Sequence, residues 1–222
     1  NGSPGGEVYT TEAARPMLRT CGGNIRITGL RLLGNDPHQC PAEYYSNSCP
    51  RPDNTGGVNC RDCTTQSIGV FAENHDNIEF DNNEMAGWAH AAIYARNTKN
   101  LHVHHNYIHH TQRQGLGYGV VLMRGGSNIV DVLVEWNRFN YNRHAIAGSG
   151  EPGQSYVARN NLVLEHANGH VFDMHGSNEN VGDNSPWAGT HIEVYDNTVL
   201  VDDHYTMVIR GRPEEGAWLY NN

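Results

Sequence analysis

The sequence is poor in basic residues, has no long apolar run and has no cysteine after residue 63. Its 222 residues include 15 Lys and Arg against 24 Asp and Glu, which gives a formal net charge of −9. This charge argues against a phosphate-binding surface, so we expect no nucleic-acid partner. Hydrophobic residues make up 37% of the chain. No apolar run approaches the roughly 20 residues of a membrane-spanning helix, so we expect no membrane span.

The cysteines that are present gather near the N-terminus. Residues 34–66 form a polar segment rich in Pro, Asn, Ser and Gly, and it contains Cys40, Cys49, Cys60 and Cys63. Four thiols in a long polar insertion favour two disulfides in an oxidising compartment, with Cys21 as the odd thiol. A zinc site that includes Cys60 and Cys63 is the alternative. The disulfide interpretation predicts a secreted, extracellular protein.

One short strand pattern recurs six times, and every copy ends on asparagine. These asparagines are Asn83, Asn106, Asn137, Asn161, Asn197 and Asn222. The intervals between them are 23, 31, 24, 36 and 25 residues, which indicates a period near 24 with loop insertions. A second strand pattern lies between successive copies. Two or three short strands per turn at this period predict a parallel β-helix, with an asparagine ladder inside the coil.

The stacked turns and the asparagine ladder resemble the right-handed parallel β-helix superfamily, which includes pectate lyases and related polysaccharide-active proteins. The segments HHNYIHH, RHAIAGSG and FDMHG also resemble uncharacterised secreted members from bacteria and archaea. The resemblance implies an all-β, right-handed parallel β-helix. We expect one domain over residues 1–222, with the cysteine-rich insertion at 34–66. Such folds include lyases, hydrolases, epimerases and non-catalytic binders, so the fold alone does not give the function.

Alternation along the second strand pattern separates two faces. The inward set is predicted to be Val70, Ala72, Ile93, Ala95, Val121, Met123, Ile146, Phe172, Met174, Met207 and Ile209. Two outward columns then hold Glu73, Arg96, Arg124, Ser149, His175 and Arg210, and Phe71, Tyr94, Leu122, Ala147, Asp173 and Val208. His90, Tyr118, Arg143 and His204 precede the strand on the outward side. His144 and His170 alternate inward, which indicates structural histidines.

The outward face is rich in Arg, His and Tyr, which favours an acidic polysaccharide as the partner. β-Elimination on a uronic acid needs a cation beside the carboxylate, a base at C5 and an acid for the leaving oxygen. We predict Arg124 or Arg143 as the cation, His175 as the base and Tyr118 as the acid, with Asp173 as a further catalytic candidate. The substrate-binding candidates are Arg96, Tyr94, His90, Arg210 and His204.

Two other chemistries are weaker interpretations of the same residues. A glycoside hydrolase needs two carboxyl groups roughly 5 to 9.5 Å apart, and Asp173 has no evident acidic neighbour on this face. Related lyases use calcium to bridge acidic sugars, but no acidic cluster here specifies calcium. The first strand pattern offers weak candidates for a transition-metal site, with charge pairs between neighbouring turns as the alternative. These candidates are Glu79, Asp81, His102 and His104.

A non-catalytic role is the second functional class. The final segment, GAWLYNN, stops in the middle of a turn, which would expose an unpaired strand edge. We therefore expect that the chain continues beyond residue 222 or that a partner covers this end. End-to-end self-association into a filament or surface layer, or a glycan-binding module without catalysis, is the alternative to a lyase.

Overall fold

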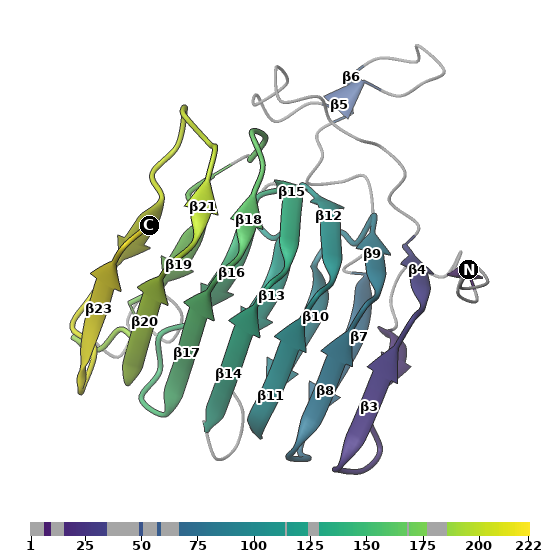
Figure 1. The fold of residues 1–222 in the computed structure, drawn as a ribbon, viewed down its shortest axis with the longest axis horizontal. Coiled ribbons are helices and arrows are strands. Elements are labelled where there is room, and N and C mark those ends of the chain that lie inside the picture. Colours follow the sequence, from purple (N-terminus) through teal and green to yellow (C-terminus); the bar gives the residue numbers. More distant parts are fainter. Residues whose placement is uncertain are drawn as a thin grey trace.

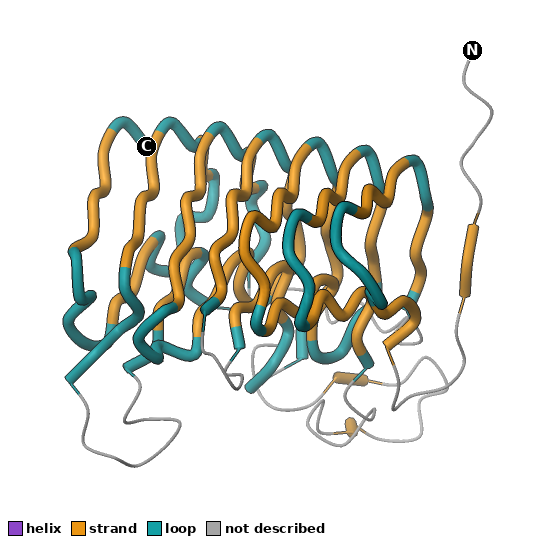
Figure 2. Tube along the Cα trace, turned by 90° about the horizontal axis from the view of Figure 1, so that it is seen from below, coloured by secondary structure: helices purple, strands orange, loops and turns teal. Residues whose placement is uncertain are grey.

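The computed structural model describes residues 7–9, 16–34, 49–50, 57–58, 67–113, 115–123, 129–167, 169–176 and 186–222. Over these ranges the chain winds in successive turns, and the turns add their strands to three parallel sheets (Figures 1 and 2). This architecture confirms the predicted parallel β-helix. Within the described ranges, no segment forms a helix that is long and apolar enough to cross a membrane.

Each of the three sheets contains seven strands. Sheet 1 contains β1 (Glu7–Tyr9), β4 (Arg31–Leu33), β9 (Glu84–Ala86), β12 (Tyr107–Thr111), β15 (Arg138–Asn142), β18 (Leu162–Val163) and β21 (Thr198–Val199). Sheet 2 contains β2 (Pro16–Arg19), β7 (Ile68–Glu73), β10 (Ala91–Arg96), β13 (Tyr118–Leu122), β16 (His144–Gly148), β19 (Phe172–Met174) and β22 (Met207–Ile209). Sheet 3 contains β3 (Ile25–Thr28), β8 (Ile78–Asp81), β11 (Thr98–His104), β14 (Val130–Glu135), β17 (Gln154–Arg159), β20 (His191–Tyr195) and β23 (Gly216–Tyr220).

The cysteine-rich insertion contributes a short antiparallel pair, β5 (Cys49–Pro50) and β6 (Gly57–Val58). Cys40, Cys60 and Cys63 lie outside the described residues, and so does the side chain of Cys49. The two disulfides therefore stay a prediction. Cys21 is exposed and its thiol is free.

The interior of the coil is one apolar core, because alternate side chains of all three sheets point into it. Its largest fully buried side chains are Trp88, Tyr156, Phe80, Phe139 and Phe172. A core of this kind fixes the register of each strand, since a slip by one residue would turn every apolar side chain to the opposite face.

An asparagine ladder runs through the bends between sheets 3 and 1. The side-chain Nδ2 of each asparagine donates to the Oδ1 of the next, at 3.1 Å from Asn83 to Asn106 and at 2.8 Å from Asn197 to Asn222. The residue before each ladder position takes a left-handed conformation; at Trp136, for example, φ is 55°. This conformation turns the chain sharply, and the buried amide then bonds the next turn.

Strand β13 has a register one residue away from the predicted one. Val120 pairs with Ile93 and Ile146, so Val120 and Leu122 belong to the core while Val121 faces outward. The prediction that Val121 and Met123 point inward and Leu122 outward is therefore wrong. Met123 occupies the outward column assigned to Arg124, and Arg124 itself lies outside the described residues.

Gly119, near the start of β13, lies where a neighbouring backbone and a core ring leave no room for a side chain. A Cβ atom at Gly119 would lie 2.6 Å from the carbonyl oxygen of Ala145 and 3.0 Å from the ring of Phe139. We expect Gly119→Ala to lower the free energy of unfolding by about 1–3 kcal/mol, because neither neighbour can move without shifting a core turn. Urea denaturation measures this effect. Gly22→Ala is the control, since its Cβ would meet its nearest atom only at 4.0 Å. Equal stability of the two variants would contradict the close contact.

Candidate functional site

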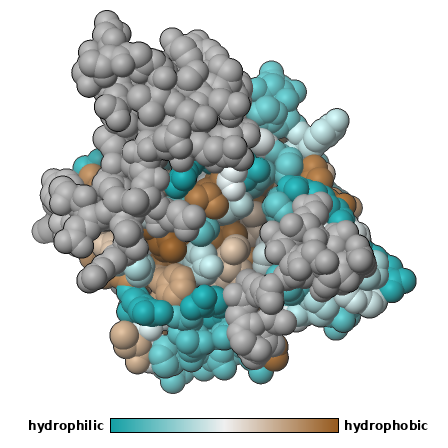
Figure 3. Space-filling model, turned by 180° about the vertical axis from the view of Figure 1, so that it is seen from behind, coloured by the Kyte–Doolittle hydropathy of each residue, from teal (hydrophilic) through white to brown (hydrophobic). Residues whose placement is uncertain are grey.

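The outer face of sheet 2 carries a row of rings that crosses neighbouring turns. The rings of Phe71 and Tyr94 lie 4.7 Å apart, and His90 contacts Tyr94 edge-on at 5.2 Å. Tyr118 follows at 6.0 Å from His90 and stacks on His144 at 5.7 Å. Figure 3 views the molecule from behind, where apolar and polar side chains adjoin. We call Phe71, Tyr94, His90 and Tyr118 the aromatic row.

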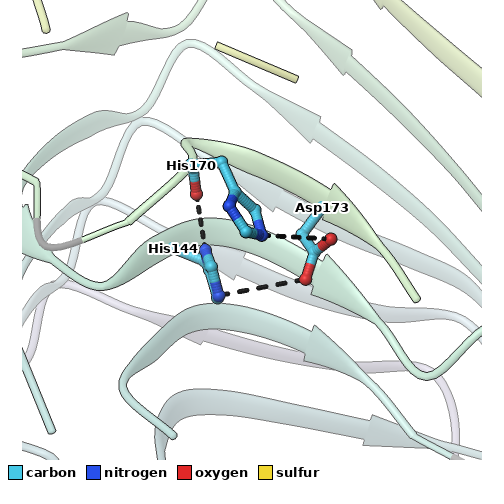
Figure 4. Close-up of side chains that lie close together, drawn as sticks. All are labelled: His144, His170 and Asp173. Atoms are coloured by element: carbon cyan, nitrogen blue, oxygen red, sulfur yellow. Dashed lines mark hydrogen bonds and ion pairs between the residues drawn. The ribbon is translucent and has the colours of Figure 1, made fainter. Parts of the chain in front are cut away.

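The row leads to a cluster centred on Asp173, whose side chain is fully buried on the outer side of β19. Arg210 Nη2 lies 2.8 Å and His175 Nε2 3.0 Å from Asp173 Oδ2. On the other side, His170 Nε2 lies 3.4 Å from Oδ1 and His144 Nε2 lies 3.8 Å from Oδ2 (Figure 4). These five residues form what we call the Asp173 cluster.

Three neighbouring turns supply the Asp173 cluster. His144 begins β16, Asp173 is the central residue of β19, and Arg210 directly follows β22. His170 and His175 flank β19 at its two ends. Strands of sheet 2 stack about 4.8 Å apart, so side chains at matching positions of neighbouring turns reach one another. The cluster therefore follows from strand order and register rather than from closeness in sequence.

The charges in the cluster are unevenly distributed. Burial works against ionisation of Asp173, but hydrogen bonds from His170 and His175 and nearby positive charge hold its pKa well below the usual range. Burial, together with the charge of Arg143, lowers the pKa of His144 to about 3, so its ring is neutral at physiological pH. Burial raises the pKa of Tyr118 and keeps its phenol protonated. The cluster therefore combines an anion, a guanidinium and imidazoles in one place.

The match to known families agrees with this architecture. A family model described as a right-handed β-helix region matches residues 52–199, which is more than half of the chain. The chain belongs to the right-handed β-helix family. No curated protein and no solved structure gives a significant match. Membership of the right-handed β-helix family establishes the fold, and the chemistry has to be argued from the side chains on its outer faces.

The predicted catalytic trio does not meet at one point of this right-handed β-helix. Arg143 and Tyr118 lie together, since the Arg143 Cζ is 5.9 Å from the Tyr118 ring and its Nη1 donates to the carbonyl of Leu116 at 3.1 Å. Tyr118 is in β13, however, two strands away from β19, which His175 follows. This separation is about 10 Å along the sheet. The described catalytic candidates therefore form two separate pairs, Asp173 with His175 and Arg143 with Tyr118.

The substrate-binding candidates fall into separate places. Tyr94 and His90 belong to the aromatic row, and Arg210 belongs to the Asp173 cluster. Arg96 forms an ion pair with Glu73, and its Cζ lies 5.1 Å over the Phe71 ring. His204 is half-buried in the segment before β22. Of the predicted substrate-binding residues, Arg210 is therefore the one that contacts Asp173 directly.

The weak metal candidates lie on sheet 3, away from the cluster. Glu79, Asp81 and His104 come within 4.8 Å of one another. Arg26 donates to both oxygens of Asp81, at 2.8 and 2.7 Å, and His104 Nε2 lies 2.9 Å from Glu79. The ring of His102 lies 4.0 Å from that of His104, its Nε2 is 2.8 Å from Glu135 Oε1, and it borders a hollow of about 410 Å³. These contacts fit the alternative of charge pairs between turns.

Two members of the cluster were missed by sequence reasoning. His144 and His170 were predicted to point inward, and that prediction is wrong, because both approach Asp173 on the outer side of sheet 2. Alternation fails at the start of these strands. In β10, the equivalent Ala91 belongs to the outer apolar cluster, whereas Ala92 and Ile93 both belong to the core. The sequence signal that could have found His144 is its alignment with the outward Tyr118.

Proposed function

We propose that this protein is secreted and cleaves an acidic, uronate-containing polysaccharide by β-elimination at the Asp173 cluster. The main support is that two partly exposed groups, His175 and Arg210, contact one fully buried carboxylate at 3.0 and 2.8 Å. The aromatic row continues from the cluster along the same face. Its four side chains are each more than nine-tenths buried, so they form a packed apolar base for this face and offer a sugar only a small part of their surface. An acidic polysaccharide of this kind is extracellular, which agrees with the proposed secretion.

The reaction uses groups already in contact. The guanidinium of Arg210 pairs with the uronate carboxylate and stabilises the negative charge that develops there. His175 takes the proton from C5, and the electrons of the C5–H bond form the C4–C5 double bond. The C4–O4 bond breaks and its electron pair leaves with O4. The imidazolium of His175 then returns the proton to O4, so the reaction needs no further acid.

Asp173 is a positioning residue in this scheme. Its carboxylate orients His175 and balances the positive charge that the ring gains when it takes the proton. Hydrolysis has less support. The positions that flank Asp173 on neighbouring strands are Ala147 and Val208. In addition, its lowered pKa leaves Asp173 ionised, so it cannot protonate a leaving group.

Ultraviolet absorbance of the unsaturated uronate product tests the proposal. The full chain is incubated with pectate, alginate, hyaluronan, heparan, ulvan and glucuronan, each with and without calcium. We expect absorbance to rise on one of them, and His175→Ala to lower kcat by about 100- to 10,000-fold. Arg210→Lys is also expected to lower the rate, because an ammonium group lacks the planar fork that matches a carboxylate.

His102→Ala is the matched control, since it removes a partly exposed histidine from sheet 3. This variant should cleave at the wild-type rate. A flat trace on every glycan, with no new reducing ends, would overturn the proposed activity. Glycan binding without cleavage would then favour the non-catalytic alternative.

A further inference from the structure

We propose that His144, His170 and Asp173 form a binding site for one divalent transition-metal ion. Their ligand atoms lie within 4.8 Å of one another, with separations of 3.4 Å from His170 and 3.8 Å from His144 to the carboxylate oxygens (Figure 4). Ligand atoms that share a tetrahedral metal at about 2.1 Å stand about 3.4 Å apart. The side chains therefore have nearly the spacing of a metal site.

The hydrogen bonding of His144 is that of a metal ligand. Its Nδ1 donates to the backbone carbonyl of His170, and a carbonyl only accepts, so the proton is on Nδ1. The lone pair of Nε2 then faces Asp173 at 3.8 Å, beyond hydrogen-bond length. The ring is fully buried, and the described residues give its Nε2 no hydrogen-bond partner. Metal-bound histidines commonly donate their second N–H to a backbone carbonyl in this way.

His170 places a second ring nitrogen at the same space. His170 Nε2 lies 3.0 Å from Arg210 Nη2 and 3.4 Å from Asp173 Oδ1, and in the neutral ring with its proton on Nδ1 this nitrogen can bind a metal. The same Nη2 donates to Asp173 at 2.8 Å. Two imidazole nitrogens and a carboxylate thus converge, and the Nε2 of His144 has no hydrogen-bond partner among the described residues. A cation bound among the three groups satisfies all of them.

The ligand types select the class of metal. Two imidazoles and one carboxylate suit Zn²⁺, Mn²⁺, Fe²⁺ or Co²⁺ in a site with open positions. Calcium prefers a shell of oxygen ligands, so we do not expect calcium to bind here. Such a site would leave room for a further ligand, and His175 and Arg210 adjoin it through their contacts with Asp173. A uronate oxygen would coordinate there; this role rests on the proposed function, whereas metal binding itself does not.

Metal content tests the proposal without any activity measurement. The purified full chain is stripped with a chelator, reconstituted with Zn²⁺, Co²⁺ or Mn²⁺, with Ca²⁺ as the comparison, and dialysed. We expect one equivalent of transition metal per chain and a visible absorption band for the cobalt form. His170→Ala should weaken binding by more than about 100-fold. His104→Ala, from the histidine–carboxylate group of sheet 3, should bind like the wild type.

Circular dichroism and thermal unfolding show whether each variant is folded. His170 is partly exposed, and His170→Asn, which keeps a polar side chain, is the second variant if alanine disturbs folding. Absence of bound metal in the reconstituted wild type, or equal binding by the folded His170 and His104 variants, would overturn the metal site. Metal binding without cleavage of any glycan would leave the site standing and contradict only the proposed function. Cleavage of a glycan in the presence of chelator, by protein without bound metal, would support the proposed function and contradict the metal site.

Discussion

Asn137→Ala is expected to lower the free energy of unfolding by about 4 kcal/mol, the largest effect on stability that we predict for a single side chain. Asn137 Nδ2 donates to the carbonyls of Val103 and Glu135, at 2.8 and 3.0 Å, and to Asn161 Oδ1 at 3.1 Å. Its own Oδ1 accepts from the backbone and side-chain nitrogens of Asn106, both at 3.0 Å. Alanine removes all of these bonds. Asn161 Oδ1 keeps the backbone N–H of residue 137 and Asn106 Nδ2 keeps two carbonyls, so the loss comes from the remaining buried groups, at about 1–3 kcal/mol each.

Chemical denaturation in urea measures this loss. Asn140→Ala is the control, because Asn140 is half-buried and its Oδ1 accepts a bond from the backbone N–H of Tyr141 at 3.1 Å. One lost bond of this kind is expected to cost about 0.5–1.5 kcal/mol. Similar losses in the two variants would mean that the ladder adds no more stability than an ordinary turn.

Asp173→Asn is expected to lower kcat for glycan cleavage by about 1,000- to 10,000-fold, the largest effect on activity. The amide has nearly the shape of the carboxylate but no charge. It therefore cannot balance the imidazolium of His175 or hold Arg210 by an ion pair. KM should rise as well, because Arg210, which Asp173 holds in place, also pairs with the uronate carboxylate. Steady-state kinetics on the cleaved glycan separates the two parameters.

The control for this variant is Asp131→Asn, which removes an exposed carboxylate from sheet 3. It should leave both kinetic parameters unchanged. Thermal unfolding of Asp173→Asn shows whether the protein is folded at the assay temperature. A folded variant with wild-type kcat would show that Asp173 does not act through His175.

The fold could be predicted because its signals are local and repeated. Each ladder asparagine follows a strand at the same offset, so six copies specify the turn, the period and the face that points inward. One glycine marked the limit of this reasoning. In the structure Gly119 lies beside Ala92, because Tyr118 pairs with Ala91 and Val120 with Ile93. The sequence pattern instead aligned Val120 with Ala92. This shift of one residue led to the wrong prediction that Val121 points inward.

The site could be predicted in part. Asp173, His175 and Arg210 were placed on one face, because simple alternation holds through β19 and β22. His144 and His170 were not, because they lie where the chain enters a strand and alternation does not yet apply. Whether neighbouring turns bring four other side chains to the carboxylate of Asp173 depends on loop paths that one sequence does not specify. The trio proposed from sequence was therefore spread over two strand spacings.

The asparagine ladder keeps the same geometry between turns that differ in their number of residues. Its side-chain bonds stay between 2.8 and 3.1 Å, although the intervals between its members range from 23 to 36 residues. The two longest intervals contain the connections that follow β13 and β19, the strands that carry Tyr118 and Asp173. Insertions or deletions in these two connections can change the residues available to a ligand without changing the register of any strand. Selection can therefore diversify ligand preference in this architecture at nearly constant folding stability.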